Sequence, residues 1–292
     1  MRPLWRALWL ALAASCGLHA AAKLPAQLRI QALAPGTVAV VQIPATDLPP
    51  RCTLTGLSQE AGFYLWGSAT AVALLAVPLE TKPGNLDLRL SWEGGLKSQG
   101  LRLKVLPSPY PRQKIKVARL HKRLKAARQD GEAEVLEGAQ ARSPGGPRWR
   151  GAFIAPVPGP LTAPFGALRT YNRGQASWRH KGEDLRAGEG TPVLASNEGQ
   201  VALARPSLAL SGGTVVLAHG YGLTSAYYHL SRLEVAEGQL LKKGQVLGLS
   251  GATGLATGPH LHFQMELNGH PVDPRQWILE QGPSQASGRS LE

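Results

Sequence analysis

The sequence predicts a mainly β protein in three consecutive parts: an N-terminal immunoglobulin-like β-sandwich, a short helical connector and a C-terminal antiparallel β domain. Three observations support this prediction. Apolar and polar residues alternate in short runs in both halves of the chain, and glycine and proline separate these runs. Between the two halves lies a charged stretch whose pattern is compatible with a helix. Short alternating runs between turn residues are typical of β-sandwiches and small β domains.

Residues 1–22 are predicted to be a secretory signal peptide. Two arginines precede an apolar run, which ends in three consecutive alanines before Lys23; this order of features is typical of export signals. The run is too short, and too soon followed by polar residues, to predict a membrane span. We therefore expect an exported protein of the periplasm or cell envelope, or a secreted one. Cys16 leaves a lipoprotein signal open, although Ala13 stands where such signals carry a larger aliphatic residue.

Residues 23–106 are predicted to form the immunoglobulin-like module. Apolar residues alternate along Val38–Ile43, Leu86–Trp92 and Leu101–Val105, and turn sequences such as PGN and EGG lie near these runs. The close spacing of the runs is typical of an all-β sandwich. After removal of the signal, Cys52 is the one cysteine left, so no intramolecular disulfide can form and we expect a buried structural thiol.

Residues 107–147 are predicted to be a basic helical connector. A proline-rich hinge, SPYP, precedes a helix-compatible stretch that runs through Leu136, basic in its first half and acidic in its second. The loop ARSPGGP then ends the segment.

The connector carries much of the net charge of +13, since Pro111–Arg128 contains no acidic residue. Such a segment favours a polyanionic partner. Because the chain is expected to be exported, we expect no nucleic acid, and anionic envelope polymers or a membrane surface become the candidate partners of residues 111–128. The alternative is a helix whose basic face only meets solvent.

Residues 148–282 are predicted to be a compact β domain, because short apolar runs return there between glycines and an NGH sequence marks a hairpin turn. Residues 283–292 lack apolar content, and we expect them to form a disordered tail.

The stretch GPHLHFQM places His260 and His262 at strand spacing. Alternate side chains of a strand share a face, so these imidazoles and Gln264 point to one side while Leu261 and Phe263 point to the other, into a core. The two histidines can thus serve one site.

A second segment, WRHKGEDL, supplies His180 and Asp184 around the flexible Gly182. Imidazole and carboxylate are common zinc ligands. If these two residues and one histidine of the 260/262 pair bind one Zn²⁺, the ion keeps an open position for water, as a catalytic zinc requires. The other histidine of that pair and His229 of SAYYHLS would then accept the proton of the water and stabilise charge on the substrate carbonyl.

These motifs resemble those of lysostaphin-type (LytM-like) zinc metalloendopeptidases, which hydrolyse peptide bonds in peptidoglycan. The resemblance covers about 151–277 and includes PFGALRTYN, GTPVLAS and KKGQVLGLSGATGLATGPHLHF. It implies a LytM-like antiparallel β domain that cleaves peptidoglycan stems or cross-links through a zinc-activated water, with one Zn²⁺ per chain.

The resemblance also implies the residue roles. His180, Asp184 and His262 would be the metal ligands, and His229 and His260 the catalytic residues. By the same resemblance, one wall of a substrate groove is expected at Arg169, Tyr171 and Asn172, with packing or loop bracing as the alternative. Tyr227 and Tyr228 face opposite sides of a strand, so one of them can pack while the other reaches the site; Tyr227 is the candidate for substrate binding.

The alternative from another functional class is a non-catalytic protein that binds the cell wall or activates an amidase through a LytM-like domain. The residues favour the enzyme, because a binding protein has no need of two additional histidines beside the metal ligands.

Overall fold

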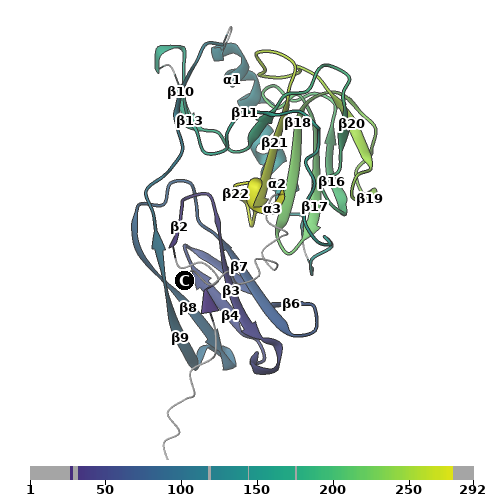
Figure 1. The fold of residues 1–292 in the computed structure, drawn as a ribbon. Coiled ribbons are helices and arrows are strands. Elements are labelled where there is room, and N and C mark those ends of the chain that lie inside the picture. Colours follow the sequence, from purple (N-terminus) through teal and green to yellow (C-terminus); the bar gives the residue numbers. More distant parts are fainter. Residues whose placement is uncertain (1–26, 29–31, 118–119, 144, 175, 279–292) are drawn as a thin grey trace, which may run out of the picture.

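The computed structural model describes residues 27–28, 32–117, 120–143, 145–174 and 176–278. In this part of the chain two β bodies pack against each other, joined by strand β10 and helices α1 and α2 (Figure 1). The prediction of a mainly β protein is confirmed. The predicted signal peptide (1–22) and tail (283–292) lie outside the described residues. No helix within the described ranges is long and apolar enough to cross a membrane.

Two sheets packed face to face form the N-terminal module. The first has the order β1 (Gln27–Leu28), β3 (Val38–Pro44), β7 (Thr70–Ala76), β6 (Tyr64–Trp66). The second has the order β2 (Ala32–Leu33), β9 (Lys97–Val105), β8 (Gly84–Trp92), β4 (Thr53–Gly56), β5 (Gln59–Gly62). Short 3-10 turns follow β3 and β8 at η1 (Ala45–Asp47) and η2 (Glu93–Gly95). Cys52 is a buried free thiol in the core between the sheets. The closer assignment of this module as immunoglobulin-like stays a prediction.

The side chains of β3 divide between two cores. Ala39, Val41 and Ile43 pack in the core between the two sheets of the module. Val38 and Val40 point the other way and join the core of the C-terminal domain. Because successive side chains of a strand face opposite sides, one run of small and branched apolar residues serves both cores.

Aromatic rings fill the contact between the module and the C-terminal domain. The ring centroid of Tyr64 lies 6.0 Å from that of Trp149 and 4.3 Å from that of Tyr221. Trp149 in turn meets Trp277 edge to face, with centroids 5.9 Å apart. Large buried rings dominate the free energy of such interfaces. The two bodies therefore share one apolar core.

The connector begins with a strand that the sequence pattern does not predict. β10 (Arg112–Ile115) pairs in parallel with β12 (Leu168–Tyr171), and α1 (Leu120–Gln129) and α2 (Glu132–Gln140) follow. Arginine and lysine at alternate positions of an edge strand look like a basic helix in the sequence. The predicted helix starts later than its basic run, because the first part of that run extends the sheet of β12.

Helix α2 packs on the C-terminal domain. Its residues Val135, Leu136 and Ala139 contact an apolar cluster that includes Leu203 and Val216. The second half of the connector is therefore a structural part of that domain.

The C-terminal domain is built around one large sheet with the order β11 (Leu161–Ala163), β14 (Glu183–Leu185), β21 (Leu261–Leu267), β18 (Leu223–Leu233), β17 (Gly213–Gly220), β16 (Gly199–Arg205), β19 (Leu240–Leu241). Further strands attach to it or complete the sheet of β10: β15 (Pro192–Leu194), β20 (Val246–Ser250), β22 (His270–Val272), β13 (Ala176–Arg179). The turn η3 (Asn172–Gly174) links β12 to β13, and α3 (Arg275–Ile278) follows β22.

The predicted alternation is confirmed from Leu261 to Phe263 of β21, whereas His260 lies just before the strand, in an isolated bridge with Gly251. Leu261 and Phe263 lie fully buried in the core, while His262 is partly exposed on the opposite face. The predicted hairpin follows, since β21 pairs with β22 across Asn268 and Gly269, both of which have positive φ angles. Asparagine and glycine adopt these angles most readily, so the NG pair fixes the register that presents His262.

Candidate active site

The turn before β14 and the strand itself carry His180 and Asp184. Gly182 between them runs so close to β21 that a Cβ at this position would lie 2.3 Å from the carbonyl oxygen of Phe263. Only glycine permits this approach of two backbones. In the resulting register Asp184 lies directly opposite His262.

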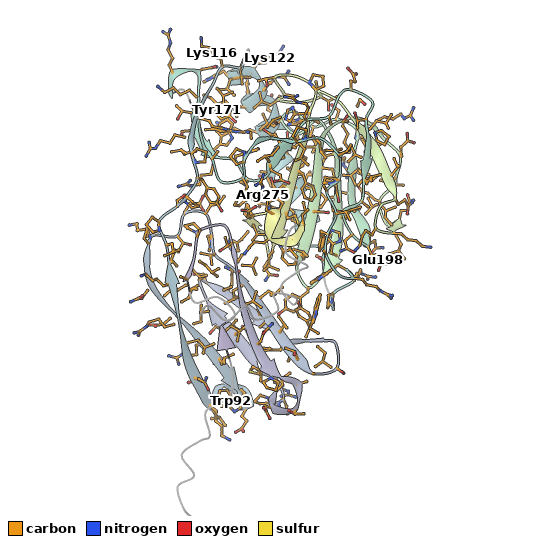
Figure 2. The ribbon with its side chains drawn as sticks, viewed as in Figure 1. Trp92, Lys116, Lys122, Tyr171, Glu198 and Arg275 are labelled. Carbon is orange, nitrogen blue, oxygen red and sulfur yellow. The ribbon has the colours of Figure 1, made fainter. Side chains whose placement is uncertain are left out.

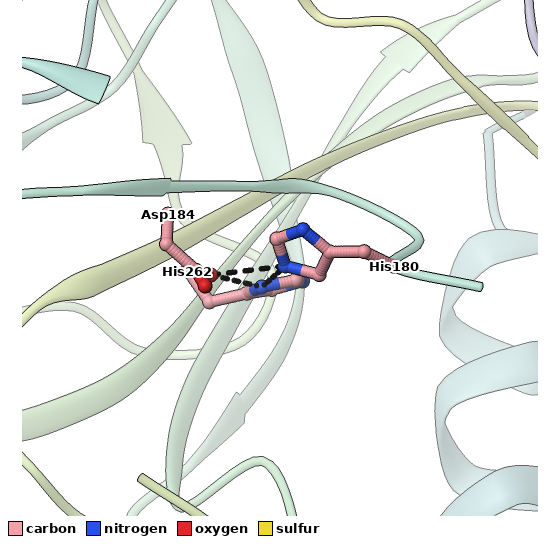
Figure 3. Close-up of side chains that lie close together, drawn as sticks. All are labelled: His180, Asp184 and His262. Atoms are coloured by element: carbon pink, nitrogen blue, oxygen red, sulfur yellow. Dashed lines mark hydrogen bonds and ion pairs between the residues drawn. The ribbon is translucent and has the colours of Figure 1, made fainter. Parts of the chain in front are cut away.

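Three ligand atoms converge at this point (Figure 3). Nε2 of His180 lies 3.0 Å from Oδ1 of Asp184 and 2.9 Å from Nδ1 of His262. The same Nδ1 lies 2.9 Å from Oδ1 of Asp184. Two distant segments of the chain thus bring two imidazoles and one carboxylate together, in a group that could hold a metal ion.

The outer nitrogen atoms of these imidazoles indicate which tautomers are present. Nδ1 of His180 donates to the carbonyl oxygen of Pro164 at 2.8 Å, which leaves a lone pair on Nε2. Nε2 of His262 faces Oε1 of Gln264 at 3.5 Å, which favours a lone pair on Nδ1. Two lone pairs and a carboxylate at such distances repel one another unless a cation lies between them. The donor set therefore fits a metal ion.

Burial shapes the protonation of this group. Asp184 forms an ion pair with the guanidinium of Arg169 through its second carboxylate oxygen, which favours the ionised form of the carboxyl group. Burial lowers the pKa of His180 to about 4. At neutral pH the group therefore contains an ionised carboxylate and a neutral His180, the forms in which these side chains bind metals.

His229 and His260 lie beside the three ligand atoms, with ring centroids 4.8 Å apart. Nδ1 of His229 donates to the carbonyl oxygen of Thr253 at 2.8 Å, and Nδ1 of His260 donates to that of Gly258 at 2.8 Å. Nε2 of each ring is then an unprotonated acceptor. Nε2 of His260 lies 3.8 Å from Oδ1 of Asp184.

A groove with a cavity volume of about 730 Å³ opens over these histidines. His229, His260 and Asp184 form part of its lining. Its other lining residues come from the loop before β21, from β11 and β12, from Arg186 after β14, and from residues 113–117 in and after β10. The basic segment of the connector therefore forms one wall of the groove.

The four predicted substrate-binding residues have different positions. Arg169 and Tyr171 line the groove, and the ring of Tyr171 stacks on Trp178 with centroids 4.1 Å apart. Asn172 accepts from the backbone N–H of Val117 at 2.8 Å and donates to its carbonyl oxygen at 2.9 Å, so that it holds the segment after β10.

Tyr227 lies away from the groove, contrary to our expectation. It is fully buried, and its hydroxyl accepts from the backbone N–H of Ser196 at 2.9 Å. Its neighbour Tyr228 stacks on the ring of His262 instead, with centroids 5.3 Å apart. The register explains this, because Tyr227 pairs with the core residue Phe263 and Tyr228 pairs with His262. Tyr227 therefore does not line the groove.

Sequence reasoning missed the ion pair between Arg169 and the second oxygen of Asp184, and the packing of Tyr228 on His262. It also missed the carboxylate of Glu132, which is buried against the loop beside His229. Strand alternation indicates that one of Tyr227 and Tyr228 faces the site, but only the register against β21 shows that it is Tyr228. The other two contacts join segments far apart in the chain.

Fold and site together define a class: mainly β proteins whose candidate metal ligands come from two paired strands and the turn that precedes one of them. Residues 178–274 match the model of peptidase family M23. A crystal structure from Pseudomonas aeruginosa that is assigned to peptidase M23 aligns with 84% of this chain and 94% of its own, at 31% identity and a TM-score of 0.65. The chain belongs to peptidase family M23, which confirms the resemblance to lysostaphin-type enzymes.

Two curated relatives share the peptidase region. An uncharacterized metalloprotease of Haemophilus influenzae is 39% identical over 114 residues, 39% of this chain and 24% of that protein. The peptidoglycan DD-endopeptidase ShyA of Vibrio cholerae is 34% identical over 144 residues, 49% of this chain and 31% of that protein. The matches thus cover less than a third of the length of these relatives.

Proposed function

We propose that this protein is an exported zinc metalloendopeptidase that hydrolyses peptide bonds in the stems or cross-links of peptidoglycan. The observation that carries the proposal is the convergence of His180, Asp184 and His262 on one point, with His229 and His260 beside it. The endopeptidase name of the Vibrio cholerae relative supports peptidoglycan as the substrate. The apolar run in residues 1–22 supports export.

Zn²⁺ suits the donor set in both chemistry and spacing. Imidazole and carboxylate are ligands of catalytic zinc, and tetrahedral bonds of this ion place its ligand atoms about 3.3 Å apart. The three atoms here are separated by 2.9 to 3.0 Å and need to move little. When bound, zinc would supply a Lewis acid that polarises the peptide carbonyl and lowers the pKa of water.

His229 and His260 have the chemistry for the proton transfers of peptide hydrolysis. Burial lowers the pKa of His229 to about 3, and the nearby His262 and His260 add to this effect. A neutral imidazole with its Nδ1 proton held by a carbonyl oxygen can accept a proton at Nε2 and later donate it to the leaving amine. His260, which lines the groove, would stabilise negative charge on the substrate oxygen when its Nε2 carries a proton and donates it.

The alternative function is a non-catalytic wall-binding protein or amidase activator. Such a protein has no chemical need of two further imidazoles whose free nitrogens border the same groove. The complete set of five residues therefore favours hydrolysis.

Purified protein incubated with peptidoglycan tests this choice. Hydrolysis releases new amino groups, and mass spectrometry of fragments from defined muropeptides identifies the bond that is cut. Binding to sedimented peptidoglycan without any release of amino groups would support the non-catalytic alternative and contradict our proposal.

We also propose that residues 111–128 help to hold the protein on anionic envelope polymers or a membrane surface. Lys116 and Lys122 are exposed at the end of the molecule farthest from Trp92 of the N-terminal module (Figure 2). Deletion of this segment would also remove a wall of the groove, so charge reversal is the cleaner test. When retention on the cell wall is measured at low salt, it should be lower for a Lys122→Glu/Lys125→Glu variant than for the wild type. Equal retention of this variant and of a Lys82→Glu/Lys104→Glu control would contradict the proposal.

A further inference from the structure

Glu132, the first residue of α2, is a buried carboxylate with no part in the reaction proposed above. It is 3% exposed. Its Oε2 accepts from the backbone N–H of Leu210 at 2.8 Å, and its Oε1 accepts from the backbone N–H and the hydroxyl of Ser211 at 2.9 and 2.7 Å. Burial of a carboxylate is unfavourable unless donors compensate for the lost water, and these three donors do so. Glu132 therefore fixes the loop at Leu210 and Ser211.

The same loop holds the backbone of His229. The carbonyl oxygen of Ser211 accepts from the backbone N–H of His229 at 2.8 Å. His229 has a φ of +63°, in the left-handed region that residues other than glycine rarely adopt. A strained backbone of this kind persists only where surrounding contacts fix it. The bond from Ser211 is one of those contacts, and Glu132 holds Ser211 from the other side.

The imidazole of His229 is held by a second loop, which packs against the first. Its Nδ1 donates to the carbonyl oxygen of Thr253, and the hydroxyl of Thr253 accepts from the backbone N–H of Gly213 at 2.8 Å. Gly212 lies so close that a Cβ there would come within 2.2 Å of the Thr253 hydroxyl. Arg123 of α1 donates to the adjacent carbonyl oxygen of Gly254. Each connector helix therefore contacts one of the two loops that position His229: α2 through Glu132 and α1 through Arg123.

We propose that Glu132 is a positioning residue for His229, and that helices α1 and α2 of the connector form part of the active-site apparatus. Glu132 acts through the loop at Ser211, which keeps Nε2 of His229 aimed into the groove. Both helices lie outside residues 178–274, the segment that matches the family model. The inference rests on the catalytic role proposed for His229.

Variants of Glu132 in the full chain test the inference. Glu132→Ala removes all three acceptor contacts, whereas Glu132→Gln keeps the shape and one acceptor oxygen. We expect Glu132→Ala to lower kcat on a defined muropeptide by more than about tenfold, with KM changed by less than about threefold and zinc content unchanged. Glu132→Gln should recover part of the loss. Glu134→Ala, at an exposed position of the same helical turn, is the matched control and should keep full activity.

A double-mutant cycle separates positioning from a general loss of structure. If Glu132 acts through His229, Glu132→Gln should cost almost no turnover when His229 is already alanine. If the activity losses of Glu132→Gln and His229→Ala were additive, this would contradict the inference. An activity loss in Glu132→Gln that is explained by lost zinc or by lowered thermal stability would also contradict it. Independently of activity, Glu132→Gln should shift the NMR signals of the His229 ring, and unchanged signals would overturn the inference. Full turnover of His229→Ala alone would instead contradict the proposed function.

Discussion

Arg169 donates from Nη2 to Oδ2 of Asp184 at 2.5 Å, on the carboxylate oxygen opposite the one that faces His180 and His262. The same guanidinium donates from Nε to the side chain of Gln113 at 3.1 Å. Because Gln113 belongs to β10, this arginine ties the connector strand to a candidate metal ligand. Partners of this kind orient a ligand and tune its affinity for the metal.

Loss of this ion pair should weaken metal binding. Arg169→Ala is expected to raise the zinc Kd about 10- to 100-fold, because Asp184 loses the partner that fixes its orientation. Arg169→Lys should recover only part of the affinity, since one ammonium group cannot reproduce the planar fork that reaches both Gln113 and Asp184. Competition with a chelator measures the Kd. Wild-type affinity in Arg169→Ala would show that the ion pair does not support the metal.

The two histidines beside the ligands should be needed for turnover but not for metal. His229→Ala and His260→Ala are each expected to lower kcat by about 10²-fold or more, because each removes a group that handles protons or charge in the transition state. Both variants should retain zinc in elemental analysis. Loss of zinc from His260→Ala would mean that the roles within the HLH sequence are reversed.

His219 should make the fold sensitive to acid. It is fully buried, with Nδ1 2.7 Å from the carbonyl oxygen of Glu198 and Nε2 2.8 Å from the hydroxyl of Ser225. Burial lowers its pKa from 6.5 to about 4. Below pH 6.5 His219 binds a proton in the unfolded chain but stays neutral in the folded protein until the pH approaches 4. The free energy of unfolding therefore falls as the pH drops from 6.5 towards 4, by about 3 kcal/mol in total.

Chemical denaturation across this pH range tests the role of His219. The difference in unfolding free energy between wild type and His219→Gln should shrink on acidification, because the other titrating groups are common to both proteins. A difference that stays constant from pH 7 to 4 would refute this source of acid sensitivity.

The shared apolar core should make the two β bodies unfold together. Tyr64→Ala is expected to cost about 3 kcal/mol or more, since it empties the space beside Trp149 and Tyr221. Leu65→Ala, at the next position of β6, is the control, because Leu65 is 63% exposed and its loss should cost less than about 0.5 kcal/mol. Calorimetry should show one transition in the wild type. Two well-separated transitions, with Tyr64→Ala moving only one of them, would contradict a shared core.

The sequence predicted those parts of the site that short-range patterns encode. The alternation in HLHFQ placed His262 opposite the core, and Gly182 between His180 and Asp184 indicated a backbone turn that lets these two side chains converge. The structure agrees on the alternation because that rule is local. Gly182 has a further reason that the sequence does not show, since its missing Cβ leaves room for the backbone of Phe263.

Contacts between distant segments could not be read in the same way. Nothing local connects Gln113 to Arg169, or Glu132 to Ser211, since each pair meets only after the connector docks on the C-terminal domain. Tyr227 and Tyr228 differ in facing by one residue, and choosing between them required the register of β18 against β21. The basic residues of β10 do not distinguish an edge strand from a helix, because solvent-exposed lysines suit both equally.

Elemental analysis of protein purified without a metal-binding tag tests the central claim most directly. The account predicts one zinc ion per chain in the wild type and loss of this ion in Asp184→Ala or His262→Ala, which remove ligand atoms from the convergent group. A folded wild-type protein that binds no zinc, even when zinc is supplied, or an Asp184→Ala variant that keeps a full equivalent, would contradict the account.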